Sequence, residues 1–282
     1  MVARRFKQVD VFTKVPFLGN PVAVVLESAG LSAGDMQRIA AWTNLSETTF
    51  VLPPASPGAD YRLRIFTPRA ELPFAGHPTI GSAHAVIEAG LVKPKGGRLR
   101  QECGTGILDL EVEGQTIWLD APPATDIPVD AADLGLLEKI LNAKSSGVPR
   151  IMNVGPRWLI ADLGDAAKVG ALAPDMAALA ELSNRLSIGG VTVYGAAADG
   201  RSSVHVRSFA PAHGIPEDPV CGSGNISVAA YLMMTTGQGA TNYIARQGMQ
   251  MGRDGEVSIR YDGKKIFLGG SAVTCVDGLL QS

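Results

Sequence analysis

The chain has 282 residues, of which 46% are hydrophobic and 18% are charged, and its formal net charge is −2. This composition is typical of a soluble globular protein, and the lack of excess positive charge argues against nucleic acid as a partner. The length allows two domains, each with its own core. Glycine and proline are frequent, at 33 and 18 residues, which indicates many tight turns and a strand-rich mixed fold.

The cysteines and the N-terminus bear on where the protein acts. Cys103, Cys221 and Cys275 are far apart and lack the Cys-x-x-Cys spacing of a zinc or redox site. The N-terminus contains no apolar segment of signal-peptide length, and no stretch approaches the roughly 18 apolar residues of a membrane span. The sequence therefore predicts a cytoplasmic protein that binds neither a metal nor a membrane.

Hydrophobic periodicity predicts short strands and a few helices along the chain. In the first half, strands are predicted at 7–12, 22–26, 49–52, 61–66, 107–112 and 116–119, and helices at 32–43 and 79–89. In the second half, strands are predicted at 153–154, 158–161, 191–194, 203–209, 257–261 and 265–268, and helices at 134–143, 176–186 and 224–236. Glycine, proline or aspartate stands at most of the breaks.

Part of the chain recurs. FTP at 66–68 and ELPFAGHPTI at 71–80 correspond to FAP at 209–211 and EDPVCGSGNI at 217–226. The offset is 143 residues from Phe66 to Phe209 and 146 residues from Glu71 to Glu217. Chance recurrence of proline and glycine before a helix explains either piece alone. It explains less well the shared order of strand, Phe-x-Pro, acidic residue, glycine and helix, so we interpret the chain as a duplication with a cleft between two similar domains.

Each copy presents a glycine at the start of a helix, Gly76 in the first and Gly222 in the second. A helix N-terminus has unpaired amides and a partial positive charge, so it attracts anions. No lysine lies in either loop and the phosphate-binding Gly-x-x-x-x-Gly-Lys pattern is absent. These features favour a small carboxylic acid as the ligand.

Several motifs taken together resemble the PhzF-like isomerase and epimerase family of phenazine biosynthesis. They are NLSETTF at 44–50, ELPFAGHPTIG at 71–81 and EDPV-x-GS at 217–223, with GNPVAV at 19–24 and QG and MGR at 247–253. The resemblance implies an α+β, duplicated diaminopimelate epimerase-like fold with two pseudo-symmetric domains, each a curved mixed β-sheet around a central helix. The domains are expected at 1–124 and 125–270, with a last strand at about 271–282 that crosses back to the first.

The resemblance also implies an enzyme that moves protons without a metal or cofactor. By it, Glu47 is the acid/base, while His77 and Asp218 orient the substrate. Gly76, Gly222 and Ser223 are expected to bind a small carboxylic-acid substrate through their amides. A glutamate enclosed by protein has a raised pKa, which suits a group that both removes and returns a proton. Similar proteins often pair, so a homodimer is possible.

Two alternatives remain open. Cys221 lies in a CGSG segment that resembles a thiol motif of amino-acid epimerases, so an epimerase assisted by Cys221 is one alternative. Such enzymes use two facing thiols, and the internal alignment places Ala75 opposite Cys221, which disfavours the two-thiol mechanism. The other alternative is a non-catalytic small-molecule sensor that uses the same cleft.

Overall fold

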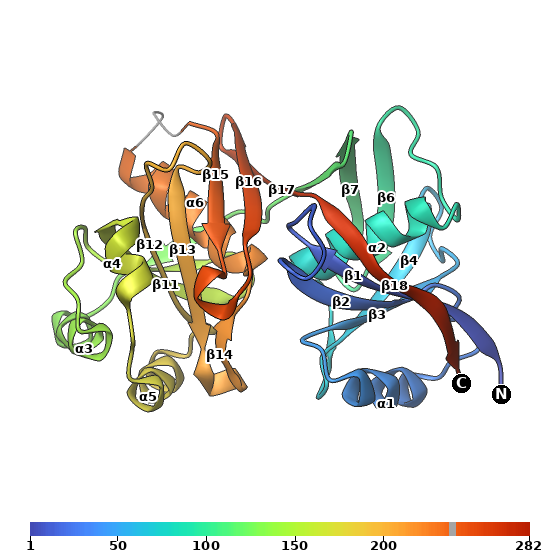
Figure 1. Ribbon diagram of the computed structural model, residues 1–282, viewed down its shortest axis with the longest axis horizontal. Coiled ribbons are helices and arrows are strands. Elements are labelled where there is room, and N and C mark those ends of the chain that lie inside the picture. Colours follow the sequence, from blue (N-terminus) through green and yellow to red (C-terminus); the bar gives the residue numbers. More distant parts are fainter. Residues whose placement is uncertain (237–240) are drawn as a thin grey trace. The chain divides into compact units, whose positions relative to one another are not determined.

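The chain folds into two units that both mix strands and helices (Figure 1). The computed structural model describes residues 1–236 and 241–282. The first unit comprises Met1–Asp120 and Gly269–Ser282, and the second comprises Ala121–Leu268. Each unit has a mixed sheet and few helices, so the predicted α+β class is confirmed.

The first unit consists of a mixed sheet and two helices. Its helices are α1 (Ala33–Thr43) and α2 (Gly76–Glu88). Its strands are β1 (Ala3–Val11), β2 (Asn20–Val25), β3 (Thr48–Leu52), β4 (Tyr61–Phe66), β5 (Glu71–Leu72), β6 (Arg98–Cys103), β7 (Gly106–Glu113), β8 (Thr116–Asp120) and β18 (Ala272–Gln281). The order across the sheet is β18-β1-β2-β3-β4-β6-β7-β8, with β5 beside β4. The pairs β2–β3 and β4–β6 are parallel and the others are antiparallel.

The second unit repeats this topology. Its helices are α3 (Ala131–Leu141), α4 (Ala166–Ala171), α5 (Met176–Leu186) and α6 (Gly222–Thr236), with 3-10 turns η1 (Pro211–His213) and η3 (Met249–Met251). Its strands are β9 (Thr125–Ile127), β10 (Arg150–Asn153), β11 (Arg157–Asp165), β12 (Gly190–Ala196), β13 (Val204–Ala210), β14 (Ile215–Asp218), β15 (Tyr243–Gln247), β16 (Gly255–Asp262) and β17 (Lys265–Gly270). The order β9-β10-β11-β12-β13-β15-β16 has parallel pairs at β11–β12 and β13–β15, and β14 lies beside β13. The parallel pairs therefore occupy corresponding places in the two units.

Each sheet curves around one apolar helix. In the first unit α2 packs against β1, β2, β3, β4, β8 and β18, and in the second α6 packs against β10, β11, β12 and β16 (Figure 1). Small residues dominate both helices, which are GHPTIGSAHAVIE and GSGNISVAAYLMMTT. Small side chains let strands approach the helix closely from several sides. The first turns of α2 and α6 carry most of the predicted site residues.

The remaining helices cover the outer faces of the sheets. In the first unit, α1 buries Met36 and Ala40 against Phe50 and Phe66. In the second, α3 and α5 bury leucines against β11 and β12, including Leu137, Leu179 and Leu182. Side chains cap the N-termini of α1 and α5, as in the Ser32 and Asp35 capping box of α1, but no side chain caps α3.

Some predicted boundaries are wrong for identifiable reasons. The helix predicted at 79–89 begins at Gly76, because Pro78 fits the first helical turn, where no amide needs an acceptor. The strands β6 and β15 were missed. Their inward positions include buried polar residues, Gln101 in β6 and Gln247 in β15, which break the apolar alternation that marks a half-buried strand.

A paired arginine and glutamate recur in the two units and support the duplication. In the first, Arg64 on β4 forms a two-bond fork with Glu71 on β5, with both distances at 2.7 Å. In the second, Arg207 on β13 forms the same fork with Glu217 on β14, with both distances at 2.8 Å. Each arginine also stacks on the phenylalanine two residues later, at 5.1 and 4.9 Å from the ring centroid. The arginines and glutamates are separated by the same offsets as the repeated motifs.

Candidate active-site residues in the two units

The predicted site residues form two groups, one in each unit. Glu47, His77 and Gly76 belong to the first unit, whereas Asp218, Gly222 and Ser223 belong to the second. Each group gathers around the N-terminus of the central helix of its unit.

In the first unit, Glu47 lies against His77. Helix α1 ends in Asn44, a left-handed C-cap with φ 55°, and the chain then turns into β3, which pairs with β2. This connection places Glu47 Oε2 at 3.4 Å from His77 Nε2, in the first turn of α2. The side chains are only 15% and 9% exposed. The structure thus brings together two of the predicted residues.

The environment of Glu47 suits proton transfer. Burial raises the pKa of the Glu47 carboxyl above its ordinary value, and a hydrogen bond from Ser46 offsets this only in part. Glu47 Oε2 is buried and accepts no well-formed hydrogen bond from the described residues. One carboxylate oxygen is therefore buried without a hydrogen-bond donor in the described part of the chain, 3.4 Å from His77 Nε2.

The start of α2 is left open to a ligand. Its N-cap residue, Ala75, makes no side-chain hydrogen bond to the helix. The peripheral helices α1, α4 and α5 are capped by side chains, Ser32, Asp165 and Asp175, whereas α3, like α2, has no side-chain cap. An uncapped N-terminus keeps amide donors and a partial positive charge for an anion. Gly76, the first residue of α2, presents such an amide.

In the second unit, Asp218 forms a turn that leads into α6. Its Oδ1 accepts a hydrogen bond from the Val220 amide at 3.0 Å, and its carbonyl oxygen accepts one from the Gln247 side chain at 2.9 Å. Asp218 is half-buried. One carboxylate oxygen thus shapes the turn, which accounts for aspartate before proline here even apart from any contact with substrate.

The first amides of α6 differ in their partners. The Cys221 amide donates to Gln247 Oε1 at 3.2 Å, and the Gly224 amide donates to Cys221 Sγ at 3.3 Å. The described part of the chain offers no acceptor to the amides of Gly222 and Ser223. The Ser223 hydroxyl is occupied, since it accepts a hydrogen bond from Trp158 Nε1 at 3.0 Å. Two adjacent amides are thus the donors that remain for an anion.

Cys221 is buried in surroundings that disfavour its thiolate form. Burial is the main cause that raises its pKa well above the ordinary value, and the nearby Asp218 carboxylate adds to the shift. Because the thiolate is the nucleophile and base, this environment opposes the Cys221-assisted epimerase alternative. The residue at the corresponding place in the first unit is Ala75, so no second thiol stands there.

The second unit has no counterpart of Glu47. Thr48 pairs with Phe66 in the first unit, and Val191 pairs with Phe209 in the second. The position before Val191 is Gly190, where a Cβ would lie 2.0 Å from the carbonyl oxygen of Phe209. No side chain fits there, so the duplicated framework carries a carboxyl group at this position in the first unit alone.

Gln247 was not assigned a role from the sequence. Its side chain is fully buried and contacts Asp218, Cys221 and Asn225. In the first unit Gln101 is also fully buried and donates to Thr79 at 3.0 Å. Both glutamines and their helix partners are separated by 146 residues, as are Glu71 and Glu217. That spacing is the signal from which Gln247 could have been found.

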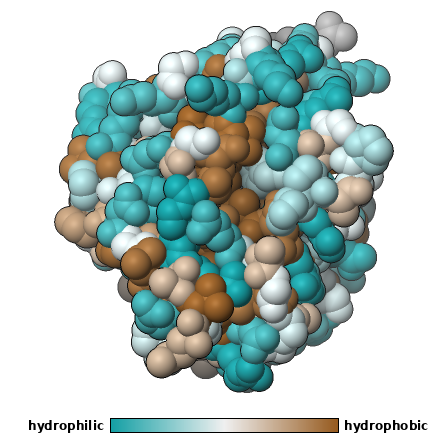
Figure 2. Space-filling view, turned by 90° about the vertical axis from the view of Figure 1, so that its right-hand side faces the viewer, coloured by the Kyte–Doolittle hydropathy of each residue, from teal (hydrophilic) through white to brown (hydrophobic). Residues whose placement is uncertain are grey.

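An apolar pocket in the first unit lies away from these residues. It has a volume of about 260 Å³ and is lined by residues that include Leu26, Leu52, Leu91 and Val92, and Figure 2 shows an apolar hollow on this face of the unit. The wall residue Tyr61 already donates its hydroxyl proton to Gln101. Leu91 and Val92 follow the C-terminus of α2, whereas Glu47 and His77 lie at its N-terminus. The pocket is therefore separate from the Glu47 group.

Among residues 1–236 and 241–282, no three histidine, cysteine, aspartate or glutamate side chains are grouped so that they could hold a metal ion. None of the helices in that described part is both long and apolar enough to cross a membrane.

Comparisons with known proteins identify the family. A profile of the phenazine biosynthesis-like protein family matches residues 9–278. A Schizosaccharomyces pombe protein named antisense-enhancing sequence 1 is 40% identical, with 99% of each chain covered. The trans-2,3-dihydro-3-hydroxyanthranilate isomerase of Pseudomonas chlororaphis is 35% identical, with 94% of this chain and 95% of the relative covered. The crystal structure of a Bacillus anthracis PhzF-family protein matches with a TM-score of 0.89 at 25% identity over the whole of both chains. The chain therefore belongs to the phenazine biosynthesis-like PhzF family of isomerases and epimerases.

Proposed function

We propose that this chain is a cofactor-independent isomerase that moves a proton between carbon atoms of a small carboxylic acid, with Glu47 as the acid/base. The Glu47 carboxylate removes a proton from one carbon, the electron pair of the broken C–H bond shifts the adjacent double bond, and protonated Glu47 returns a proton to another carbon. The proton leaves one carbon and returns to another, and the electron pair stays in the substrate, so the reaction needs no external oxidant, reductant or metal.

The environment of Glu47 is the observation that carries this proposal. A shuttle must be able to hold and to release a proton at ambient pH, and burial raises the pKa of this carboxyl toward that range. His77 Nε2 lies 3.4 Å from the Glu47 carboxyl, so a group that orients the substrate would stand beside the acid/base. No side chain fits at Gly190, the position of the second unit that corresponds to Glu47, so the duplication supplies no second carboxyl group there.

The second unit provides donors for the substrate's carboxylate. The amides of Gly222 and Ser223 stand at the positive end of α6 and have no acceptor in the described part of the chain. The Gly76 amide at the start of α2 has the same character. In this proposal His77 and Asp218 hydrogen-bond the substrate's polar substituents and so fix which carbon faces Glu47.

The test is deuterium uptake from heavy water into candidate acids. A panel that includes trans-2,3-dihydro-3-hydroxyanthranilate, the substrate named for a relative, is incubated with wild type, Glu47→Gln and Cys221→Ser, and incorporation is followed by mass spectrometry. Glu27→Gln, at an exposed position of the same unit, is the matched control. We expect wild type, Glu27→Gln and Cys221→Ser to incorporate deuterium, and Glu47→Gln to lose at least 1,000-fold in rate while retaining ligand affinity.

The other outcomes point to the alternatives. Loss of exchange in Cys221→Ser with retention in Glu47→Gln would identify a thiol-dependent epimerase. Binding of an acid by every variant, without exchange in any of them, would identify a non-catalytic sensor. Either result overturns the assignment of Glu47.

A further inference from the structure

The side chain of Gln247 makes three hydrogen bonds around the start of α6. Its Oε1 accepts from the Cys221 amide at 3.2 Å and from Asn225 Nδ2 at 2.9 Å, and its Nε2 donates to the Asp218 carbonyl oxygen at 2.9 Å. Because Gln247 is fully buried, these bonds do not compete with water. One side chain thus joins both ends of the turn from Asp218 to Cys221.

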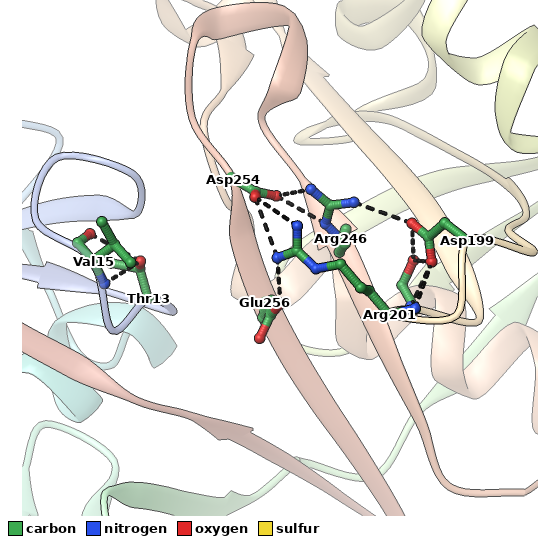
Figure 3. Close-up of polar contacts among 8 residues, drawn as sticks. Thr13, Val15, Asp199, Arg201, Arg246, Asp254 and Glu256 are labelled. Atoms are coloured by element: carbon green, nitrogen blue, oxygen red, sulfur yellow. Dashed lines mark hydrogen bonds and ion pairs between the residues drawn. The ribbon is translucent and has the colours of Figure 1, made fainter.

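The backbone of Gln247 is itself held firmly. It pairs with Val206 of β13 and with Gly255 of β16. The neighbouring Arg246 forms ion pairs with Asp254 and Asp199, and Arg201 bridges Asp254 to Glu256 (Figure 3). This charged network ties β15 to β16 beside Gln247, so the glutamine acts from a fixed position.

The segment after Gln247 packs directly on the turn. Gly248 has φ +98°, and a Cβ there would lie 2.5 Å from the Pro219 carbonyl oxygen. Glycine is required at this position both by its conformation and by the close approach of the two backbones. The backbone at the end of β15 therefore packs against Pro219, in the turn to which the Gln247 side chain is hydrogen-bonded.

The corresponding glutamine of the first unit does not hold a turn in this way. Gln101 Nε2 donates to the Thr79 hydroxyl, and Gln101 Oε1 accepts from Tyr61 OH at 2.8 Å. Both partners are side chains. The two glutamines are therefore equally buried, but only Gln247 bonds to the backbone that precedes its helix.

We propose that Gln247 is a positioning residue that holds the Asp218–Cys221 turn so that the amides of Gly222 and Ser223 point at the substrate's carboxylate. By occupying the Cys221 amide, Gln247 leaves those two adjacent donors for the anion. By holding the Asp218 carbonyl oxygen, it also keeps that oxygen, which would repel a carboxylate, turned toward the protein interior. This inference rests on the proposed function for the identity of the ligand as a carboxylic acid.

The experiment compares Gln247→Leu with Gln101→Leu, which removes an equally buried glutamine from the other unit. Binding of 2-aminobenzoate, a stable carboxylate probe, is measured by calorimetry, and amide hydrogen exchange is followed over 215–224. We expect Gln247→Leu to weaken probe binding at least tenfold and to speed exchange in 215–224 at least tenfold. Gln101→Leu lowers thermal stability but changes both quantities less than twofold. With a turned-over acid, Gln247→Leu should raise KM more than it lowers kcat.

The remaining possible results of these measurements also decide for or against the role of Gln247. Unchanged exchange in 215–224, or an equal loss of probe affinity in Gln101→Leu, overturns the proposal. If Gln247→Leu does not fold, Gln247→Met replaces it, because methionine keeps the length of the glutamine side chain and lacks the groups that make the three hydrogen bonds. At least threefold weaker binding and faster exchange are then expected, and unchanged values refute the inference. If wild type binds no probe, the exchange measurement decides alone.

The proposed function can fail separately from this inference. Lack of deuterium uptake by wild type would remove the acid/base assignment of Glu47 without altering the exchange test of Gln247. Glu47→Gln should leave exchange in 215–224 unchanged, since Glu47 belongs to the first unit.

Discussion

Replacing the two repeated arginines should have very different effects on stability. Arg207 and Glu217 have side chains that are 6% and 10% exposed, whereas Arg64 and Glu71 are 21% and 42% exposed. The geometry of the two forks is nearly the same. Burial is therefore the variable that separates Arg207→Met from Arg64→Met.

The expected magnitudes follow from what each variant leaves behind. Arg207→Met leaves the Glu217 carboxylate buried and removes the donor to the carbonyl oxygens of Val169 and Leu172, at 3.2 and 2.8 Å. Breaking a buried pair in this way costs about 3–5 kcal/mol. Arg64→Met breaks a more exposed pair, which solvent screens, and costs about 0–1 kcal/mol. The free energies of unfolding should differ by about 3 kcal/mol.

Urea unfolding at neutral pH measures this difference, with the transition of each unit fitted separately if the two do not coincide. The double variant Arg207→Met with Glu217→Met should recover most of the loss, because two apolar side chains leave no buried charge. Equal losses in Arg207→Met and Arg64→Met, within about 0.5 kcal/mol, would refute the reasoning from burial, since additivity errors are of that size. A double variant as unstable as Arg207→Met would refute it too.

Three further predictions concern single groups. Burial raises the folded-state pKa of Glu47 above the unfolded value near 4.5, so wild type loses stability as pH rises from 4.5 through the folded-state pKa, whereas Glu47→Gln does not. The free energy of unfolding of Glu47→Gln minus that of wild type should therefore increase between pH 4.5 and pH 8. A difference that stays constant across this range in urea unfolding would contradict the prediction. Burial raises the pKa of Cys221, so iodoacetamide at pH 8 should label the partly exposed Cys103 and leave Cys221 unlabelled, as measured by mass spectrometry. Labelling of Cys221 at a rate similar to that of Cys103 would show that the Cys221 thiol is accessible. In urea unfolding, Gly190→Ala should lower the free energy of unfolding by more than about 2 kcal/mol, because the added Cβ clashes with the Phe209 carbonyl. Gly135→Ala, in open space on α3, should raise the free energy of unfolding by about 0.5–1 kcal/mol. An unchanged stability of Gly190→Ala would show that β12 can shift.

The sequence predicted the family and the duplication because both depend on motifs with fixed spacing. The recurrence of Phe-x-Pro, an acidic residue and glycine before a helix is visible without coordinates. The α+β class was implied by the resemblance to the family and is confirmed. The strands with clear alternation, such as 61–66 and 203–209, were found in nearly their observed positions.

Two of the strands that the sequence missed, β6 and β15, have polar residues at inward positions. Arg98, Arg100 and Gln101 make β6 look like a loop, yet Leu99 and Gln101 are both fully buried. The short strands β5 and β14 were missed as well, since two to four residues carry no measurable period. In each case pairing with a neighbouring strand, which is a tertiary contact, supplies the structure.

By itself the sequence determined which residue types stand at the two helix starts, and it singled out Glu47, His77, Asp218 and Ser223 by motif. Only the tertiary structure decided their electrostatic states and partners. Desolvation depends on every atom packed around a group, so the raised pKa values of Glu47 and Cys221 could not be derived from neighbours in sequence. For the same reason, two arginine–glutamate pairs with nearly the same geometry differ in burial, and of two fully buried glutamines only Gln247 bonds to the backbone before its helix.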